Sequence, residues 1–179
     1  SRFVELAGKT VGVYGCGAIG MKFAEICKAF DMRVLATKRS KISGIENGIE
    51  FTTPEELIAK SDYISFHCPL TDETRGMVDR RFISKMKDGA VLINTSRGAV
   101  FNESDVADAL RSGKLSGVGA DVLSVEPADP ANPLLSAPNA VITPHCAWTS
   151  KEARLRLMDI LDKNLDSFVK NGCGLNRVF

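Results

Sequence analysis

Short apolar runs alternate with longer amphipathic ones along the chain. The runs at 10–14 (TVGVY) and 33–37 (RVLAT) are compact and apolar, which is typical of strands buried within a sheet. Between them, the apolar residues of 19–30 recur at helical spacing and predict a helix. The alternation continues beyond residue 37. It predicts further strands at 63–67, 90–94, 117–121 and 140–143, and helices at 54–60, 81–86, 104–112 and 150–170.

Two of these helices carry additional signals. Before the helix at 54–60, Thr53 occupies the N-cap position, Pro54 the first helical position, and Glu56 completes a capping box. The longest helix, 150–170, places five apolar residues along one stripe, namely Leu155, Met158, Leu161, Leu165 and Phe168.

The order of these elements predicts an α/β fold. Strands that are apolar throughout and alternate with helices form a parallel sheet covered on both faces. Right-handed crossovers then give a doubly wound sheet of the Rossmann type. The 179 residues correspond to a single domain, 1–179. The segment 124–138 contains four prolines and is expected to run extended over the surface.

Composition excludes several classes of protein. With 44% apolar and 25% charged residues, the chain is neither disordered nor fibrous. A net charge of +1 gives no reason to expect a nucleic-acid partner. No apolar run approaches the ~20 residues that span a bilayer, and the first residues do not resemble a signal peptide. Five cysteines without CxxC spacing indicate reduced thiols in a cytoplasmic protein and no metal site.

The turn after the first strand has the sequence GCGAIG, which is the GxGxxG pattern. Its place between a strand and a helix is the context in which this pattern binds a dinucleotide. Gly15 permits the tight turn, Gly17 lets the backbone approach a pyrophosphate, and Gly20 lets the helix pack close to the strand. The N–H groups of Ala18 and Ile19 open that helix and favour an anion. The alternative is a turn that is glycine-rich only for packing.

The second strand ends in a basic run instead of the acidic residue typical of NAD sites. That position holds Lys38, followed by Arg39 and Ser40. An acid there would bind the ribose 2′-hydroxyl and repel a 2′-phosphate, whereas cations and a hydroxyl bind the phosphate. The sequence therefore favours NADP, with NAD as the other possibility. A basic loop that only faces water is the alternative interpretation.

Several segments together resemble the D-isomer-specific 2-hydroxyacid dehydrogenases. They occur in that family's order and spacing and cover nearly the whole chain. Besides the glycine turn, they are ELAGKTVG at 5–12, HCPLT at 67–71, INTSRG at 93–98, ADV at 120–122, EP at 126–127 and TPH at 143–145.

The resemblance implies a catalytic trio of Arg97, Glu126 and His145. In such a site Arg97 holds the carboxylate and polarises the carbonyl of a 2-keto acid, and His145 donates the proton as hydride arrives. Glu126 raises the pKa of the histidine and orients it. Taken singly, the three could be a surface arginine, a loop carboxylate and a helix cap. The resemblance gives the other histidine, His67, no part in proton transfer.

The resemblance also implies how a nicotinamide dinucleotide would lie along the ends of the strands. Cys68 could equally be a small core residue. The implied contacts are Ala18 and Ile19 with the pyrophosphate, Cys68 and Pro69 with the adenosine side, Thr74 with the ribose, Thr95 and Ser96 with the nicotinamide half, and Asp121 with the carboxamide.

Two further features resemble glycerate dehydrogenases, also called hydroxypyruvate reductases. They are the pair Ala147-Trp148 and the loop 126–135. Glu126 disfavours the formate dehydrogenases of this superfamily, which carry glutamine at that position. The expected substrate is a small 2-keto or 2-hydroxy acid such as hydroxypyruvate or glyoxylate, and the expected assembly is a homodimer.

Length is the main departure from the family. Its members have an additional N-terminal substrate domain of about a hundred residues, an ordinary domain size. The chain therefore resembles an isolated cofactor domain, which we expect to bind the cofactor but to turn over little substrate. Two alternatives stay open, a dinucleotide-sensing module related to corepressors and a phosphoglycerate dehydrogenase.

Overall fold

A computed structural model describes residues 4–39 and 43–177 of the chain. They form two compact units that divide between Pro144 and His145. The first unit contains the sheet and the helices packed on it, and the second contains one long helix. The units are described separately below.

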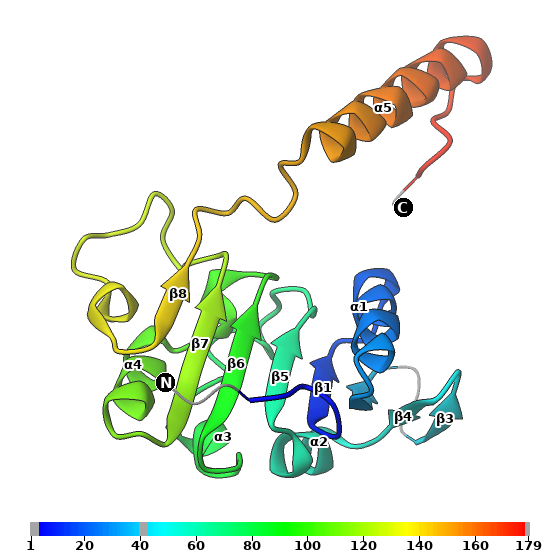
Figure 1. Ribbon diagram of the computed structural model, residues 1–179. Coiled ribbons are helices and arrows are strands. Elements are labelled where there is room, and N and C mark those ends of the chain that lie inside the picture. Colours follow the sequence, from blue (N-terminus) through cyan, green and yellow to red (C-terminus); the bar gives the residue numbers. More distant parts are fainter. Residues whose placement is uncertain (1–3, 40–42, 178–179) are drawn as a thin grey trace. The chain divides into compact units, whose positions relative to one another are not determined.

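The first unit is built on one eight-stranded sheet in the order β3-β4-β2-β1-β5-β6-β7-β8 (Figure 1). All pairings are parallel except that of β3 with β4. This order, which reverses at β1, confirms the predicted doubly wound α/β fold of the Rossmann type. The strands are β1 (Thr10–Tyr14), β2 (Arg33–Thr37), β3 (Gly44–Glu46), β4 (Ile49–Phe51), β5 (Tyr63–Phe66), β6 (Ala90–Asn94), β7 (Leu115–Ala120) and β8 (Ala140–Ile142).

The helices agree with the predicted ones to within one or two residues at nearly every end. They are α1 (Ala18–Ala29), α2 (Pro54–Lys60), α3 (Arg80–Ser84), α4 (Glu103–Arg111) and α5 (Lys151–Asn171), with short 3₁₀ turns η1 (Gly98–Val100) and η2 (Pro133–Ser136). At the start of α2, Thr53 caps the N–H of Glu56 as expected. The carboxylate of Glu56 accepts from the hydroxyl of Thr52 and pairs with Lys60.

Helices pack on both faces of the sheet, as the apolar strands predict. On one face, Ala24 of α1 packs with Val11 and Val13 of β1. On the other, α2 packs over β1 and β2, α4 packs over β7, and α3 packs against α4, in a core that includes Phe66 and Leu92. The side chains of these two residues are fully buried. Burial on both faces explains why the strand sequences are apolar without alternation.

The antiparallel edge of the sheet was not predicted. Strands β3 and β4 are three residues each, too short for a hydrophobic pattern. They are joined at Asn47 and Gly48, which both have positive φ, 51° and 73°. An Asn-Gly pair in this conformation is the strongest short-range hairpin signal. The expectation of a purely parallel sheet is therefore wrong at this edge, and the Asn-Gly pair was the signal that could have revealed it.

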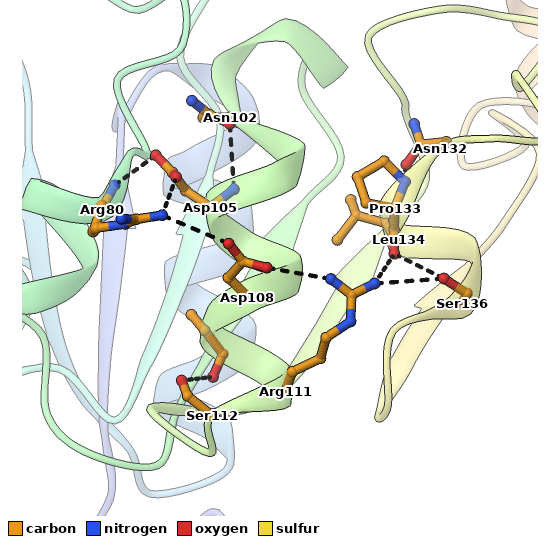
Figure 2. A network of polar contacts seen from close by, with 11 residues as sticks. Arg80, Asn102, Asp105, Asp108, Arg111, Ser112, Asn132, Pro133, Leu134 and Ser136 are labelled. Carbon is orange, nitrogen blue, oxygen red and sulfur yellow. Dashed lines mark hydrogen bonds and ion pairs between the residues drawn. The ribbon is translucent and has the colours of Figure 1, made fainter.

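Four charged residues connect α3, α4 and η2 (Figure 2). Arg80 approaches Asp105 and Asp108 at 3.4 and 3.6 Å, and Arg111 reaches Asp108 at 3.3 Å. Arg111 also donates to the carbonyl of Pro133 at 3.3 Å. The hollow between α3 and α4 measures about 480 Å³, and three of these charged residues, Arg80, Asp105 and Asp108, line it. None of the predicted site residues lines it.

The second unit consists mainly of α5, whose ends are set by local signals. Ser150 accepts from the N–H of Ala153, and the helix ends at Gly172, which has φ 71°. The apolar stripe predicted along this helix is exposed, with Leu155 at 55% and Phe168 at 59%. Among the described residues, no helix is both long enough and apolar enough to cross a bilayer.

Candidate functional site

The glycine turn lies at the carboxyl end of β1, against the end of β5. Gly15 has φ 92°, and a Cβ at this residue would lie 2.7 Å from the backbone nitrogen of Cys68. A Cβ on Gly20 would lie 2.7 Å from the carbonyl oxygen of Gly15. A Cβ on Gly17, in contrast, would stand in open space. Two glycines of the motif thus allow close packing, and the third leaves the backbone accessible.

The start of α1 suits an anion. Gly17 is its N-cap and supplies no side-chain acceptor, and the first turn contains no acidic residue. The first N–H groups of a helix have no partner within the helix, and they lie at the positive end of its dipole. Ala18 and Ile19, the predicted pyrophosphate contacts, are the first two residues of this helix. The local structure therefore fits a diphosphate group.

A hollow of about 430 Å³ adjoins the turn at the ends of β2 and β5. Lys38 and Arg39 line it, so two of the three residues predicted to hold a 2′-phosphate face one cavity. The third, Ser40, lies outside the described residues. Gly15, Cys68, Pro69 and Thr74, all predicted to contact the cofactor, line the same hollow.

Thr74 is already engaged within its own loop. Its hydroxyl donates to the carbonyl of Pro69 at 2.7 Å and accepts from the N–H of Thr71 at 2.8 Å. These bonds fix the loop that follows β5. The structure thus gives Thr74 a part in shaping the hollow, besides the ribose contact that the resemblance implies.

A second hollow, of about 450 Å³, lies along the same edge of the sheet. It is lined by Ile19 of α1, by Thr95, Ser96 and Arg97 after β6, and by residues 67–70 after β5. Cys68 and Pro69 line both hollows, so the two adjoin across the end of β5. Burial raises the pKa of the Cys68 thiol, which keeps it neutral in the wall between them.

Asn94 organises the segment that carries Arg97. This residue is fully buried at the end of β6. Its Nδ2 donates to the carbonyl of Arg97 at 3.0 Å, and its Oδ1 accepts from the N–H and the hydroxyl of Ser96. The guanidinium of Arg97 donates to the carbonyl of Ser96 at 2.8 Å and remains exposed. Sequence reasoning missed Asn94, although a polar residue closing a buried strand was the available signal.

The segments of Arg97 and Glu126 lie side by side in the first unit. A Cβ on Gly98 would lie 1.9 Å from the carbonyl carbon of Leu123, so the two backbones touch there. The carboxylate of Glu126 accepts from the N–H of Leu123 at 3.0 Å. The structure therefore brings two of the three predicted catalytic segments together.

Asp121 lies at the end of β7, between the ends of β6 and β8. Its N–H donates to the carbonyl of Asn94 at 2.9 Å, and its carboxylate accepts from the hydroxyl of Thr143. Only 6% of Asp121 is exposed. Its charge is thus held at the same sheet edge as the hollows.

His145, the third member of the predicted trio, is the first residue of the second unit. It is half-buried and has φ 52°, a left-handed conformation that is uncommon outside glycine. Such outliers persist where their surroundings hold them, and they are enriched at functional sites. Within residues 4–39 and 43–177, no cluster of three His, Cys, Asp or Glu side chains could hold a metal ion.

Comparison with known proteins places this site in a family. Residues 1–147 match the family described as D-isomer specific 2-hydroxyacid dehydrogenase, NAD binding domain. The chain belongs to this family. Its matched region, which contains the glycine turn and both hollows, is the NAD(P)-binding domain of a 2-hydroxyacid dehydrogenase.

Its relatives include enzymes with small 2-keto acid substrates in their names. A hydroxypyruvate reductase of Blautia hydrogenotrophica is 46% identical over 93% of the chain and 52% of the relative. A glyoxylate reductase of Aeropyrum pernix is 41% identical over 93% of the chain and 50% of the relative. The 2-hydroxyacid dehydrogenase domain described here thus spans about half the length of these relatives.

A solved structure agrees in fold. An acyclic imino acid reductase, solved in complex with NADPH and D-Arg, superposes with a TM-score of 0.89 at 36% identity. The match covers 98% of the chain and 55% of that protein.

Proposed function

We propose that the chain is the coenzyme-binding part of a reductase that converts a small 2-keto acid, hydroxypyruvate or glyoxylate, into its 2-hydroxy acid. The observation that carries this proposal is the pair of adjoining hollows, which run from the basic end of β2 past the glycine turn to Arg97. A dinucleotide has this sequence of parts, with a phosphorylated adenosine, a diphosphate and a nicotinamide end. Similarity to a hydroxypyruvate and a glyoxylate reductase supports this substrate class over the corepressor and phosphoglycerate alternatives.

Two catalytic residues, Arg97 and His145, and one positioning residue, Glu126, divide the reaction among them. When bound, the nicotinamide supplies the hydride that reduces the keto carbon. Arg97, exposed beside its hollow, binds the substrate carboxylate and polarises the carbonyl. His145 gives its proton to the carbonyl oxygen and takes it back in the reverse direction. Glu126 is the positioning residue that orients the imidazole and stabilises its charged form.

We propose NADP as the preferred cofactor. Lys38 and Arg39 line the hollow expected to hold the adenosine, where a 2′-phosphate would gain two cations. Ser40 is proposed to add a hydroxyl donor. The similar imino acid reductase, solved in complex with NADPH, supports this preference.

The remaining cofactor contacts follow the two hollows. Cys68, Pro69 and Thr74 are assigned to the adenosine and its ribose, and Thr95 and Ser96 to the nicotinamide half. Asp121 is assigned to the carboxamide, where it would select the face that the ring presents. Each of these side chains lies at the carboxyl edge of the sheet, where ligands of doubly wound folds bind.

We also propose that the protein works as a cytoplasmic homodimer. Cys16, Cys27, Cys68 and Cys173 are thiols outside any disulfide, as is typical of a reducing compartment. Light scattering coupled to gel filtration tests the dimer, since a purified chain that stays monomeric at micromolar concentration would contradict it.

Calorimetric titration of the purified chain with NADPH and with NADH tests the function. We expect NADPH to bind at least tenfold more tightly than NADH, and hydroxypyruvate to be reduced only slowly. If neither dinucleotide binds, the proposed function is wrong. If NADH binds more tightly, the cofactor preference alone is wrong.

A further inference from the structure

His67 lies in the cofactor crevice, although the family resemblance gives it no part in proton transfer. It follows β5 directly and lines the second hollow together with Ser96 and Arg97. Its ring packs on Phe23 of α1, with ring centroids 5.0 Å apart. The imidazole is therefore fixed between two elements that both border the proposed nicotinamide half.

The hydrogen bond between Ser65 and His67 determines the protonation of the imidazole. The Oγ of Ser65 lies 2.9 Å from Nε2 of His67, and only 1% of Ser65 is exposed. A buried hydroxyl donates its hydrogen where an acceptor exists, because leaving a buried donor unmatched is destabilising. Nε2 is the acceptor that the described residues offer this hydroxyl. With Ser65 as the donor, Nε2 carries no hydrogen, and the neutral ring carries it on Nδ1.

This arrangement disfavours the charged ring. Protonation would place a hydrogen on Nε2 of His67. The Oγ of Ser65 would then have to accept this hydrogen, and the hydroxyl hydrogen of Ser65 would have no acceptor. Burial acts in the same direction and lowers the pKa of His67. The titratable groups that share the hollow wall are the cation Arg97 and the neutral thiol Cys68, and neither favours a second positive charge. The rest of the lining is uncharged, namely Ile19, Pro69, Leu70, Thr95 and Ser96.

The second ring nitrogen is available for a ligand. Within the part of the chain that the structure describes, Nδ1 of His67 makes no hydrogen bond, whereas Nε2 has Ser65. The Nδ1–H thus belongs to a side chain on the wall of a hollow of about 450 Å³. The neighbouring Arg97 guanidinium is exposed and donates to its own segment.

We propose that His67 contacts the bound dinucleotide as a neutral Nδ1–H donor to one of its oxygens, and that Ser65 is the positioning residue that holds it in this tautomer. This inference rests on the proposed function, because it needs a dinucleotide in the second hollow. It adds a second histidine with a binding role distinct from the proton transfer assigned to His145. A neutral donor suits this place because it binds an oxygen without titrating.

The tautomer is tested first on the chain without ligand. The chain has two histidines, so long-range ¹H–¹⁵N spectra show two imidazoles, and His145→Asn assigns them. We expect His67 to carry its hydrogen on Nδ1 in the wild type. In Ser65→Ala we expect a mixture of tautomers and a higher pKa of His67. A wild-type ring with its hydrogen on Nε2 would overturn the proposal.

Binding is tested by titrating NADPH into wild type, His67→Phe and His67→Gln. Phe keeps the packing on Phe23 and removes the donor, whereas Gln keeps a donor. We expect about tenfold weaker binding to His67→Phe, the size of one hydrogen bond to a charged oxygen, and at most threefold for His67→Gln. Thermal melts establish that both variants are folded.

The outcomes separate the two proposals. If the wild type binds NADPH and His67→Phe binds it equally well, the role of His67 is wrong and the proposed function stands. If the wild type binds neither NADPH nor NADH, the proposed function and the contact of His67 fall together. If the variants do not fold, Ser65→Ala replaces them, and unchanged NADPH affinity with a mixed tautomer would also overturn the proposal.

Discussion

Gly98 and Leu123 touch along their backbones. A Cβ added to Gly98 would lie 1.9 Å from the carbonyl carbon of Leu123 and 2.1 Å from its oxygen. The contact joins the segment that begins with Arg97 to the loop that ends with Glu126. No rotamer change can relieve a clash between backbone atoms, so glycine is required here for packing. The spacing of two proposed site residues thus depends on a residue that has no side chain.

Gly98→Ala is therefore expected to destabilise the first unit. Forcing a methyl group into a packed contact costs about 1–3 kcal/mol or more. Gly119→Ala is the matched control, because a Cβ on Gly119 would meet nothing within 4 Å. Urea unfolding followed by circular dichroism measures both. Equal free energies of unfolding for the two variants would show that the loop at 121–126 yields easily.

Lys38 and Arg39, which line the hollow beside the glycine turn, are expected to determine the choice of cofactor. Arg39→Gln is expected to weaken NADPH binding about tenfold or more and to leave NADH binding within twofold, because only NADPH carries the 2′-phosphate. Arg81→Gln, on α3, removes the same charge from an exposed site that does not line the hollow. Calorimetry with both dinucleotides measures the four affinities. A parallel loss for NADPH and NADH would assign Arg39 to general anion binding instead.

Because of Asp62, the folding stability of the first unit is expected to depend on pH. Burial alone would raise its pKa, but the hydrogen bonds from Lys87 and from the N–H of Thr10, both 2.8 Å long, outweigh burial and hold the pKa below its usual value. A folded pKa below the unfolded one contributes stability above about pH 4, and this stability is lost as the pH falls through the folded pKa.

Asp62→Asn should accordingly lower the free energy of unfolding at pH 7 by about 1 kcal/mol, the usual worth of such a hydrogen bond. The difference from wild type should shrink as the pH falls toward 3. Asp88→Asn is the control. The side chain of Asp88 pairs with Lys114 but is 91% exposed, so its replacement should not change the free energy of unfolding measurably. A constant difference between Asp62→Asn and wild type at all pH values would exclude the titration of Asp62 as its cause.

Elements whose apolar residues recur at a regular spacing can be predicted from the sequence. Contacts between backbone atoms of distant segments cannot. Strand β1 and helix α1 could be predicted because their apolar spacing and the glycine turn agree. The contact of Gly98 with Leu123 spans 25 positions and leaves no periodic trace. Strands β3 and β4 are three residues long, below the length at which alternation can be recognised.

The candidate site shows the same division. Gly15, Lys38 and Arg97 could be named because motifs and resemblance mark them. Asn94 and His67 were missed as site residues, since their importance comes from hydrogen bonds with Ser96 and Ser65 that only the folded backbone creates. Residues that belong to a motif can be predicted from the sequence. The residues that orient them cannot, because their contacts depend on how the strands and loops are placed in the fold.

Helix α5 offers a last prediction, because its stability is local. Its apolar stripe is exposed, with Leu165 at 56% and Phe168 at 59%, so packing within its unit contributes little. Its last turn ends at Gly172, whose N–H donates to the carbonyl of Phe168 at 2.8 Å with φ 71°. An alanine in this left-handed conformation costs about 1–2 kcal/mol.

Gly172→Ala should therefore speed amide hydrogen exchange over the last turn of α5 about five- to thirtyfold, while the sheet of the first unit exchanges as before. Val169→Ala is the control on the same turn, since Val169 is 82% exposed and alanine is the better helix former. Exchange read residue by residue by NMR distinguishes the two. If Gly172→Ala leaves the last turn as protected as in wild type, contacts beyond the helix itself must hold it, and the exposed stripe would then be covered in solution.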